Sequence, residues 1–335
     1  NKDQNPNPNF LYFTYNTNVA GILFISKTKS PFILTYSRDK EKARRAGLKF
    51  YTVEKNKKTF ETLNEIFDEN KFNFKTIGID KENFNLLVFE KLNKHLKAEY
   101  EDISIMCKNQ RAIKSEEEIQ KIKKACKITD NVFRKLVEKF DFKTELEVKN
   151  FIEFEIKKQD ADLAFSPIVA SGPNSSNPHY DETKKLNQGF LLLDFGARYK
   201  GYCSDMSRTI YLGNPDKQEL KIYNKVLEVQ KTCLEKAEVD RNCSELFDCC
   251  FNIFGEYSDN FIHSLGHGLG LEIHETPNIG PESEDKFKQG MVFTIEPGLY
   301  FEKEFGVRIE DTVLLQEDKV QRLTKSKKDL IIIKS

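Results

Sequence analysis

Apolar and polar residues alternate in short blocks over the first hundred positions of the chain. Short apolar runs, typical of strands, are separated by charged amphipathic stretches, typical of helices. We expect strands at 20–25, 32–34 and 76–79 and helices at 38–48, 59–70 and 83–98. This alternation predicts a small α/β domain. It carries no chemical motif, which favours a structural or substrate-shaping role.

A different pattern begins after a boundary near 106–113. Ser115 and Glu118 have the spacing of a capping box, and apolar residues then recur every three or four positions, which predicts a helix with one buried face. Further helices are expected at 144–158, 216–237 and 244–257, and strands at 165–171, 190–196, 203–212, 291–296 and 307–315. We therefore predict an α+β catalytic domain with a mostly antiparallel sheet over 108–335, preceded by the α/β domain over 1–107.

Composition excludes several classes of protein. The 335 residues contain 53 lysines and arginines and 53 aspartates and glutamates, so no net charge draws the chain to nucleic acid or to a membrane surface. No apolar run approaches the roughly 20 residues that span a bilayer. The seven cysteines are an odd number without a CxxC pair, which favours a reducing, cytoplasmic location.

Two aspartates flank the turn region of LLLDFGARYKGYCSDMSRTIYLG, residues 191–213. Two apolar runs around a loop rich in Gly, Arg, Tyr and Lys predict a β-hairpin. Asp194 ends the first run and Asp205 begins the second, so the two carboxylates can lie side by side across the ladder. Either aspartate alone would more often cap a surface turn, but a buried pair requires a cation between its members.

Histidine is concentrated in HSLGHGLGLEIHE, residues 263–275. His263, His267 and His274 are separated by glycines that permit an irregular backbone, which argues against an HExxH zinc helix. His179 lies upstream, and of the five histidines only His95 lies outside this set. A single histidine is more often a packed residue than a ligand. Three within one short glycine-rich segment indicate a site.

Two glutamates interrupt apolar stretches near the C-terminus. Glu296 lies in MVFTIEPGLY and Glu310 in GVRIEDTVLL, and each is expected within an apolar strand. A buried carboxylate needs a metal, a cation or a proton. Arg308 is expected on the same strand face as Glu310, where it can hydrogen-bond to carboxylates that bind a metal.

Together the candidate ligands are four carboxylates and one imidazole, without a thiolate: Asp194, Asp205, His267, Glu296 and Glu310. Oxygen-rich sets suit Mn²⁺ or Co²⁺, with Zn²⁺ possible. Five ligands with four negative charges exceed what one hydrolytic ion with an open position requires. They fit a pair of divalent ions roughly 3.5–4 Å apart.

The chain resembles the pita-bread metallopeptidases, in their Xaa-Pro peptidase branch (prolidase and aminopeptidase P). The resemblance covers essentially the whole chain. It rests on the linker RAIKSEEEI and on five motifs in family order and spacing: FSPIVASGPNSSNPHY, LLLDFGARYKGYCSDMSRT, HSLGHGLGLEIHE, IEPGLY and GVRIED. It implies a pita-bread catalytic domain behind a small creatinase-like N-terminal domain.

The resemblance also implies a role for each candidate residue. Asp194 would chelate one ion, Asp205 and Glu310 would bridge both, and His267 and Glu296 would complete the other shell. A metal-bridging hydroxide would attack the scissile carbonyl, with Glu296 as the proton shuttle. The remaining catalytic or substrate-binding candidates, matched to the family's histidines, arginine and tyrosine, are His179, His263, His274, Arg308 and Tyr300. Packing is an equally good explanation of Tyr300.

The implied activity is a cytoplasmic, homodimeric exopeptidase acting on small peptides with proline in second position. An Xaa-Pro dipeptidase is favoured over aminopeptidase P because the length and the short N-terminal domain resemble compact microbial prolidases. One position departs from that pattern. Many such enzymes have an arginine four residues after the third histidine, whereas this chain has Asn278, which cannot form a charged bidentate clamp on a dipeptide carboxylate.

Other members of the fold supply the rival hypotheses. A methionine aminopeptidase shares the ligand set, but the N-terminal domain and Arg308 argue against it. Creatinase-like C–N hydrolases lack the complete ligand set. A pita-bread binding module for histones or nucleic acid, which would have lost its ligands, is disfavoured because all five ligand positions are filled.

Overall fold

The computed structural model describes residues 7–317 and 319–334 and divides into two compact units, Asn1–Arg111 and Ala112–Ser335. The division falls at the end of helix α5 (Ser104–Ala112), and the boundary expected after residue 107 lies inside the same helix. None of the described helices is long and apolar enough to cross a bilayer.

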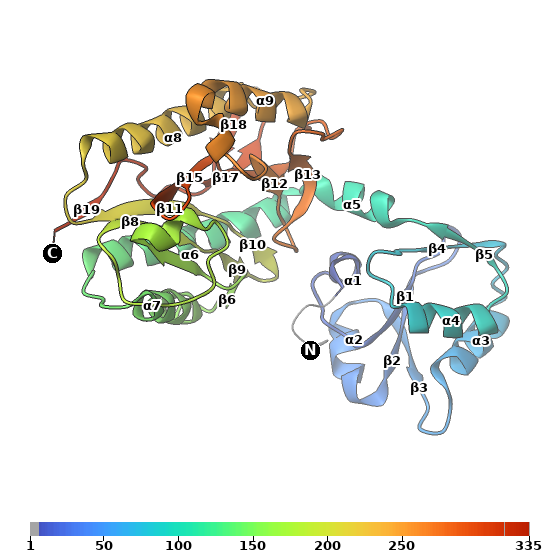
Figure 1. Ribbon diagram of the computed structural model, residues 1–335. Helices are drawn as coiled ribbons and strands as arrows, with labels where there is room; N and C mark the ends of the chain where they lie inside the picture. The colour runs from blue at the N-terminus through green and yellow to red at the C-terminus, as the bar shows by residue number, and fades with distance from the viewer. Residues whose placement is uncertain (1–6, 318, 335) are drawn as a thin grey trace. The chain divides into compact units, whose positions relative to one another are not determined.

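The N-terminal unit combines two small sheets with helices, as the alternating pattern predicts (Figure 1). Its strands are β1 (Gly21–Phe24), β2 (Phe32–Tyr36), β3 (Lys49–Val53), β4 (Thr76–Ile79) and β5 (Glu99–Asp102). Its helices before α5 are α1 (Pro8–Phe13), η1 (Ser37–Asp39), α2 (Lys40–Arg45), α3 (Thr59–Glu69) and α4 (Leu86–His95). Strand β2 pairs antiparallel with β1 and parallel with β3, and β4 pairs parallel with β5.

The helices of the second unit form two pairs, one on each side of its strands (Figure 1). They are α6 (Glu116–Glu138), α7 (Glu145–Lys157), α8 (Lys217–Lys236) and α9 (Cys243–Phe254), with 3₁₀ segments η2 (Gly172–Ser176) and η3 (Gly255–Asn260). The predicted capping box is present, since the Ser115 hydroxyl accepts from the Glu118 amide and the Glu118 carboxylate accepts from the Ser115 amide. It begins α6 at the expected place.

Two larger sheets occupy the space between the helix pairs. One has the order β19-β11-β8-β7, from β7 (Ile168–Ser171), β8 (Gly189–Asp194), β11 (Ser207–Leu212) and β19 (Ile332–Ile333). The other has the order β13-β12-β14-β17-β18, from β12 (Gly266–Gly268), β13 (Glu275–Ile279), β14 (Val292–Ile295), β17 (Asp311–Leu315) and β18 (Val320–Arg322). All pairs are antiparallel except β11 with β19.

Two smaller sheets complete the unit. Strands β6 (Asp162–Leu163), β9 (Ala197–Tyr199) and β10 (Tyr202–Cys203) form one, and β15 (Gly298–Phe301) with β16 (Phe305–Arg308) forms the other.

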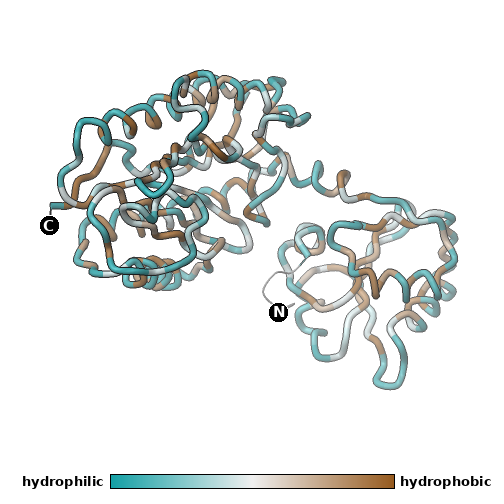
Figure 2. Tube along the Cα trace, in the orientation of Figure 1, coloured by the Kyte–Doolittle hydropathy of each residue, from teal (hydrophilic) through white to brown (hydrophobic). Residues whose placement is uncertain are grey.

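Strand β8 shows why the apolar runs are continuous. Leu191 and Leu193 pack into the core that α6 and α7 contribute to, whereas Phe190 packs with residues of α8. Because both faces of the strand are buried, both must be apolar. Each helix, in contrast, buries only one of its own faces. Hydrophobic and hydrophilic positions therefore alternate along α8 in Figure 2.

The structure corrects two expected strands and the end of a third, 291–296, which stops at Ile295. The 203–212 and 307–315 strands are each broken, the first between β10 and β11 and the second between β16 and β17. Glu310 therefore lies in a break and Glu296 follows the end of β14, so neither acid lies inside a strand as expected. Asp205 also lies in a break, because its amide donates to the Thr312 hydroxyl (3.1 Å) in place of a ladder partner.

Candidate metal centre

The five candidate ligands come from five separate segments, four of them at strand ends or breaks. Asp194 ends β8, Asp205 precedes β11, His267 is the central residue of β12, Glu296 follows β14 and Glu310 precedes β17. At such positions the backbone leaves the ladder, and a polar side chain can enter the space between two sheets without disturbing strand pairing.

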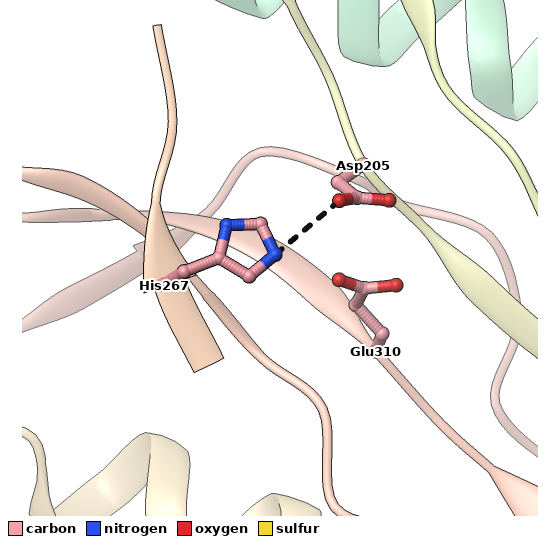
Figure 3. Close-up of side chains that lie close together, drawn as sticks. All are labelled: Asp205, His267 and Glu310. Carbon is pink, nitrogen blue, oxygen red and sulfur yellow. Dashed lines mark ion pairs between the residues drawn. The ribbon is translucent and has the colours of Figure 1, made fainter. Parts of the chain in front are cut away.

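Three of these side chains converge closely (Figure 3). One ligand atom from each of Asp205, His267 and Glu310 lies within 4.8 Å of the others. The His267 Nε2 atom is 3.6 Å from Asp205 Oδ2 and 3.3 Å from Glu296 Oε1. The structure therefore brings these residues together, and their binding of a metal stays a prediction.

Asp194 joins the cluster through Arg308. The Arg308 guanidinium donates from Nη2 to Asp194 Oδ2 (2.7 Å) and from Nε to the Ser207 hydroxyl (2.8 Å). That hydroxyl in turn donates to Glu310 Oε2 (2.8 Å). Arg308 thus links Asp194 directly, and Glu310 through Ser207. The expected reason was wrong, because Arg308 ends β16 and the strand break separates it from Glu310.

The ring of His267 is prepared to bind a cation. Its Nδ1 lies 3.1 Å from the carbonyl oxygen of Gly268, which can only accept, so Nδ1 carries the proton. Burial, together with His274, lowers the pKa of His267 to about 4. The neutral ring therefore directs the Nε2 lone pair at the carboxylates.

The carboxylates lack enough positive charge around them. Burial and then the neighbouring carboxylates raise the pKa of Asp205 and Glu310 well above their ordinary values. Burial likewise raises the pKa of Glu296 to about 8, although Arg308 opposes the shift. Without a further cation the cluster would have to take up protons at neutral pH.

Two carboxylate oxygens also lack hydrogen-bond partners. Asp194 Oδ1 and Asp205 Oδ1 are buried and accept from no group among the described residues. Buried acceptors left unpaired are costly, and divalent cations satisfy them. The oxygen-rich donors, the neutral imidazole and these two oxygens together fit Mn²⁺ or Co²⁺.

The three other histidines line the same region in different ways. The Tyr300 hydroxyl accepts from Arg308 (2.6 Å) and donates to His263 Nε2 (3.0 Å), because His263 Nδ1 donates to the Ser264 carbonyl (2.7 Å). The ring of His274 lies edge-on to His267 with centroids 4.3 Å apart, and its side chain is exposed. His179 is exposed, and its charge contributes, after burial, to lowering the pKa of both His263 and His274.

Sequence reasoning missed three hydroxyl residues that hold the acids. Thr294 donates to Glu296 Oε1 (3.1 Å) and accepts from the His267 amide. Thr312 holds the backbone of Asp205, and Ser207 lies between Arg308 and Glu310. Each lies two residues from a candidate acid, a spacing that places both on one face of an extended chain. That two-residue spacing was the signal in the sequence that could have identified these hydroxyl residues.

Asn278 lies opposite His267 in the β12–β13 ladder and is exposed. Its backbone amide donates to the carboxylate of Asp285 (2.8 Å). Cross-strand partners lie on the same face of a ladder, so its side chain is on the His267 side of the sheet.

Two family models match the chain. One, described as "Metallopeptidase family M24", matches residues 120–317, and the other, "Creatinase/Prolidase N-terminal domain", matches residues 5–113.

Similar proteins include an Xaa-Pro dipeptidase from Pyrococcus furiosus, 40% identical over 304 residues, with 89% of this chain and 84% of the relative covered. An Xaa-Pro dipeptidase from Pyrococcus horikoshii is 36% identical over 335 residues, covering 97% and 92%.

Solved structures give the same picture. An X-Pro aminopeptidase from Thermotoga maritima has a TM-score of 0.90 at 31% identity, covering 96% of this chain and 93% of that one. A prolidase from Pyrococcus furiosus has a TM-score of 0.85 at 36% identity, covering 96% and 94%. The N-terminal domain of the FACT subunit SPT16 from chickpea shares the fold, with a TM-score of 0.77 at 20% identity, covering 92% and 85%.

Proposed function

Because the chain belongs to metallopeptidase family M24 and is a peptidase with the expected α+β pita-bread architecture, we propose that it hydrolyses peptide bonds that precede proline, as an Xaa-Pro dipeptidase. The observation that carries the proposal is the cluster of buried, under-compensated carboxylates around His267. Support for the substrate comes from relatives named Xaa-Pro dipeptidase at 36–40% identity.

The residues that would hold two divalent ions are the five predicted ones. Asp194 and Asp205 each offer a buried oxygen without another partner, and His267 offers a neutral nitrogen. Bound there, divalent ions supply Lewis acidity toward the scissile carbonyl and a nucleophilic water at neutral pH. Mn²⁺ or Co²⁺ suits these donors best, with Zn²⁺ as the alternative.

Glu296 is the proton carrier in this proposal. Its Oε1 accepts from Thr294, which fixes the carboxylate beside His267. Burial favours protonated Glu296, the form in which a proton shuttle carries its proton. The group takes a proton from the nucleophile and delivers it to the leaving proline nitrogen. Delivery matters because that nitrogen leaves as a basic secondary amine.

The remaining candidates bind the substrate or shape its site. The exposed His179 and His274 can donate to the substrate carbonyl and its developing oxyanion. His263 shapes the site instead, because its Nδ1 donates to the Ser264 carbonyl and its Nε2 accepts from Tyr300. Arg308 keeps Tyr300 and Asp194 in place. The preference for proline follows from the tertiary amide of the Xaa-Pro bond, which has no N–H. A peptidase that binds its substrate through that N–H binds Xaa-Pro peptides weakly, whereas a site shaped for the pyrrolidine ring binds them well.

Aminopeptidase P is the second candidate, and Asn278 is the observation that favours it. A dipeptide substrate ends in a carboxylate close to the metals, and asparagine can offer it only one neutral hydrogen bond. Longer peptides place no charge there. The structural similarity to an X-Pro aminopeptidase at a TM-score of 0.90 is consistent with this alternative.

We propose a reducing, cytoplasmic setting and a homodimer. All seven cysteines are free, which supports the compartment. Gel filtration with light scattering tests the dimer.

Hydrolysis of Met-Pro and Met-Pro-Gly by protein stripped of metal and resupplied with Mn²⁺ or Co²⁺ tests the activity. Cleavage of the dipeptide with little of the tripeptide is expected of a dipeptidase. Preference for the tripeptide would identify aminopeptidase P. Cleavage of neither by protein that holds its metal would overturn the Xaa-Pro proposal.

A further inference from the structure

Glu145 is a fully buried carboxylate outside the metal centre. It is the first residue of α7 and has no exposed surface. A charge in that position is partly stabilised by the helix N-terminus, but burial still demands strong hydrogen bonds.

Five neutral donors satisfy it, and all come from one segment. Oε1 accepts from the Ser171 amide (2.8 Å), the Ser171 hydroxyl (2.8 Å) and the Asn174 side chain (2.9 Å). Oε2 accepts from the Tyr180 hydroxyl (3.2 Å) and the Lys184 amide (2.7 Å). One oxygen thus holds the beginning of residues 171–184 and the other holds the end.

The middle of this segment rests on the β15–β16 hairpin. The Ser175 hydroxyl accepts from the Gly306 amide (2.8 Å), and the Ser176 hydroxyl accepts from the Lys303 amide (3.2 Å). The Pro178 carbonyl accepts from Arg308 Nη1 at 3.5 Å. His179 is the next residue, so its position depends on the two anchored ends and on this contact with the arginine of the metal centre.

We propose that Glu145 is a positioning residue for the reaction: its carboxylate joins both ends of residues 171–184 and so fixes where His179 stands beside Arg308 and His263. The inference rests on the proposed function, since it assumes that His179 acts on the peptide. Without the carboxylate, the segment loses the side-chain contacts that join its two ends, and among the described residues only the backbone bonds of Lys184 and Leu186 to the start of α7 and the bonds of Asn187 to Ser171 remain. The metal ligands keep all their contacts. A misplacement of about 1 Å can cost an enzyme up to about 100-fold in rate.

The test compares Glu145→Gln with Glu155→Gln. Glu155 lies on the same helix and is also buried, but it pairs with Lys135 (2.6 Å) and not with the 171–184 segment. Both variants lose a buried charge from α7. We expect kcat/KM for the better Xaa-Pro peptide to fall by about tenfold or more in Glu145→Gln and by less than about twofold in Glu155→Gln. Mn²⁺ affinity should stay unchanged in both.

Two further measurements separate positioning from general loss of structure. In a His179→Ala background the effect of Glu145→Gln should shrink to less than about twofold, because coupled residues are non-additive. Amide hydrogen exchange in residues 171–184 should accelerate in Glu145→Gln but not in Glu155→Gln. If that variant does not fold, Tyr180→Phe removes one donor and should give smaller changes of the same kind.

An equal loss of kcat/KM in both glutamate variants, or an undiminished effect in the His179→Ala background, would overturn the positioning role. Unchanged exchange in 171–184 would overturn the anchoring itself. A wild-type protein that cleaves no Xaa-Pro peptide would instead overturn the proposed function, and the exchange result would still report on Glu145.

Discussion

Glu310 and Asp311 are neighbours in the chain and both are buried, yet their surroundings differ in charge. Asp311 pairs with Arg208 (2.6 Å), Lys328 (3.0 Å) and Arg322 (3.1 Å). Burial alone would raise the pKa of Asp311, but these cations outweigh it and lower the pKa. The Asp311 carboxylate is therefore balanced by the protein itself.

The side chain of Glu310 lies on the other side of the backbone from that of Asp311, in the candidate metal centre. Burial raises its pKa, the charges of Glu296 and Asp194 raise it further, and Arg308 compensates only in part. The contrast shows that this fold can neutralise a buried carboxylate with its own cations where the role is structural. The deficit at Glu310 marks a place where the missing charge comes from a ligand.

The largest effect is expected at Glu310 itself. Glu310→Gln should lower peptidase activity by about 10³-fold or more, because a ligand is lost. The same change should raise the melting temperature of the metal-free protein, since glutamine is neutral and can be buried without the proton uptake that Glu310 requires. Activity assays and thermal unfolding in EDTA measure the two effects, with the exposed Glu302→Gln as control. A lower melting temperature of metal-free Glu310→Gln would contradict the contrast between Glu310 and Asp311.

Asp311→Asn should have the opposite effect on stability. It leaves Arg208, Lys328 and Arg322 around a neutral side chain, and breaking a buried ion pair in this way costs about 3–5 kcal/mol. Urea unfolding of the metal-free protein gives the free energy. A loss below about 1 kcal/mol would show that the cations find other partners.

The stability of the metal-free protein should depend on pH between about 6.5 and 8. Burial raises the folded pKa of Glu296 from 4.5 to about 8, so its contribution is complete below the unfolded pKa and is lost as the pH rises through the folded value. His263 and His267 change the stability only at lower pH, because their pKa values are about 3 and 4 in the folded protein and 6.5 when unperturbed.

We therefore expect the free energy of unfolding to fall by about 1–2 kcal/mol from pH 6.5 to pH 8 in EDTA. With saturating Mn²⁺ the fall should vanish, because metal binding requires deprotonated ligands. A metal-free protein that becomes more stable over this interval would contradict the assignment. Urea unfolding at four or five pH values is sufficient.

The smallest effect concerns substrate length. Asn278→Arg adds a charged donor beside His267 and should raise the ratio of Met-Pro to Met-Pro-Gly cleavage by about tenfold, the equivalent of 1.4 kcal/mol. Asn278→Lys is the matched control, since it adds charge without a bidentate geometry. No change with arginine would place the dipeptide carboxylate elsewhere.

The sequence was sufficient to predict which residues gather in the candidate site. Glycines around His267 and acids in apolar contexts identified the residues that the structure brings together. It could not reveal the strand breaks, since the apolar runs through Asp205 and Glu310 continue across them. A side chain that leaves the ladder for a tertiary contact, such as Asp205 toward Thr312, gives no periodic signal.

The charge contrast was also beyond the sequence. Arg208 lies 103 residues before Asp311, and Arg208, Arg322 and Lys328 are indistinguishable by composition from surface cations. In the sequence, nothing distinguishes Glu145 from an ordinary first-turn acid of a helix, and its five donors come from 26 to 39 residues away. Such contacts depend on tertiary packing, which local patterns do not encode.

Calorimetric titration of the metal-free protein with Mn²⁺ at pH 7.5 tests the central claim most directly. If the deficit around Glu310 is a two-metal site, the titration should give two ions per chain with proton release, and Glu310→Gln should lose at least one of them. Binding of no ion by the wild type, or unaltered stoichiometry in Glu310→Gln, would contradict the account.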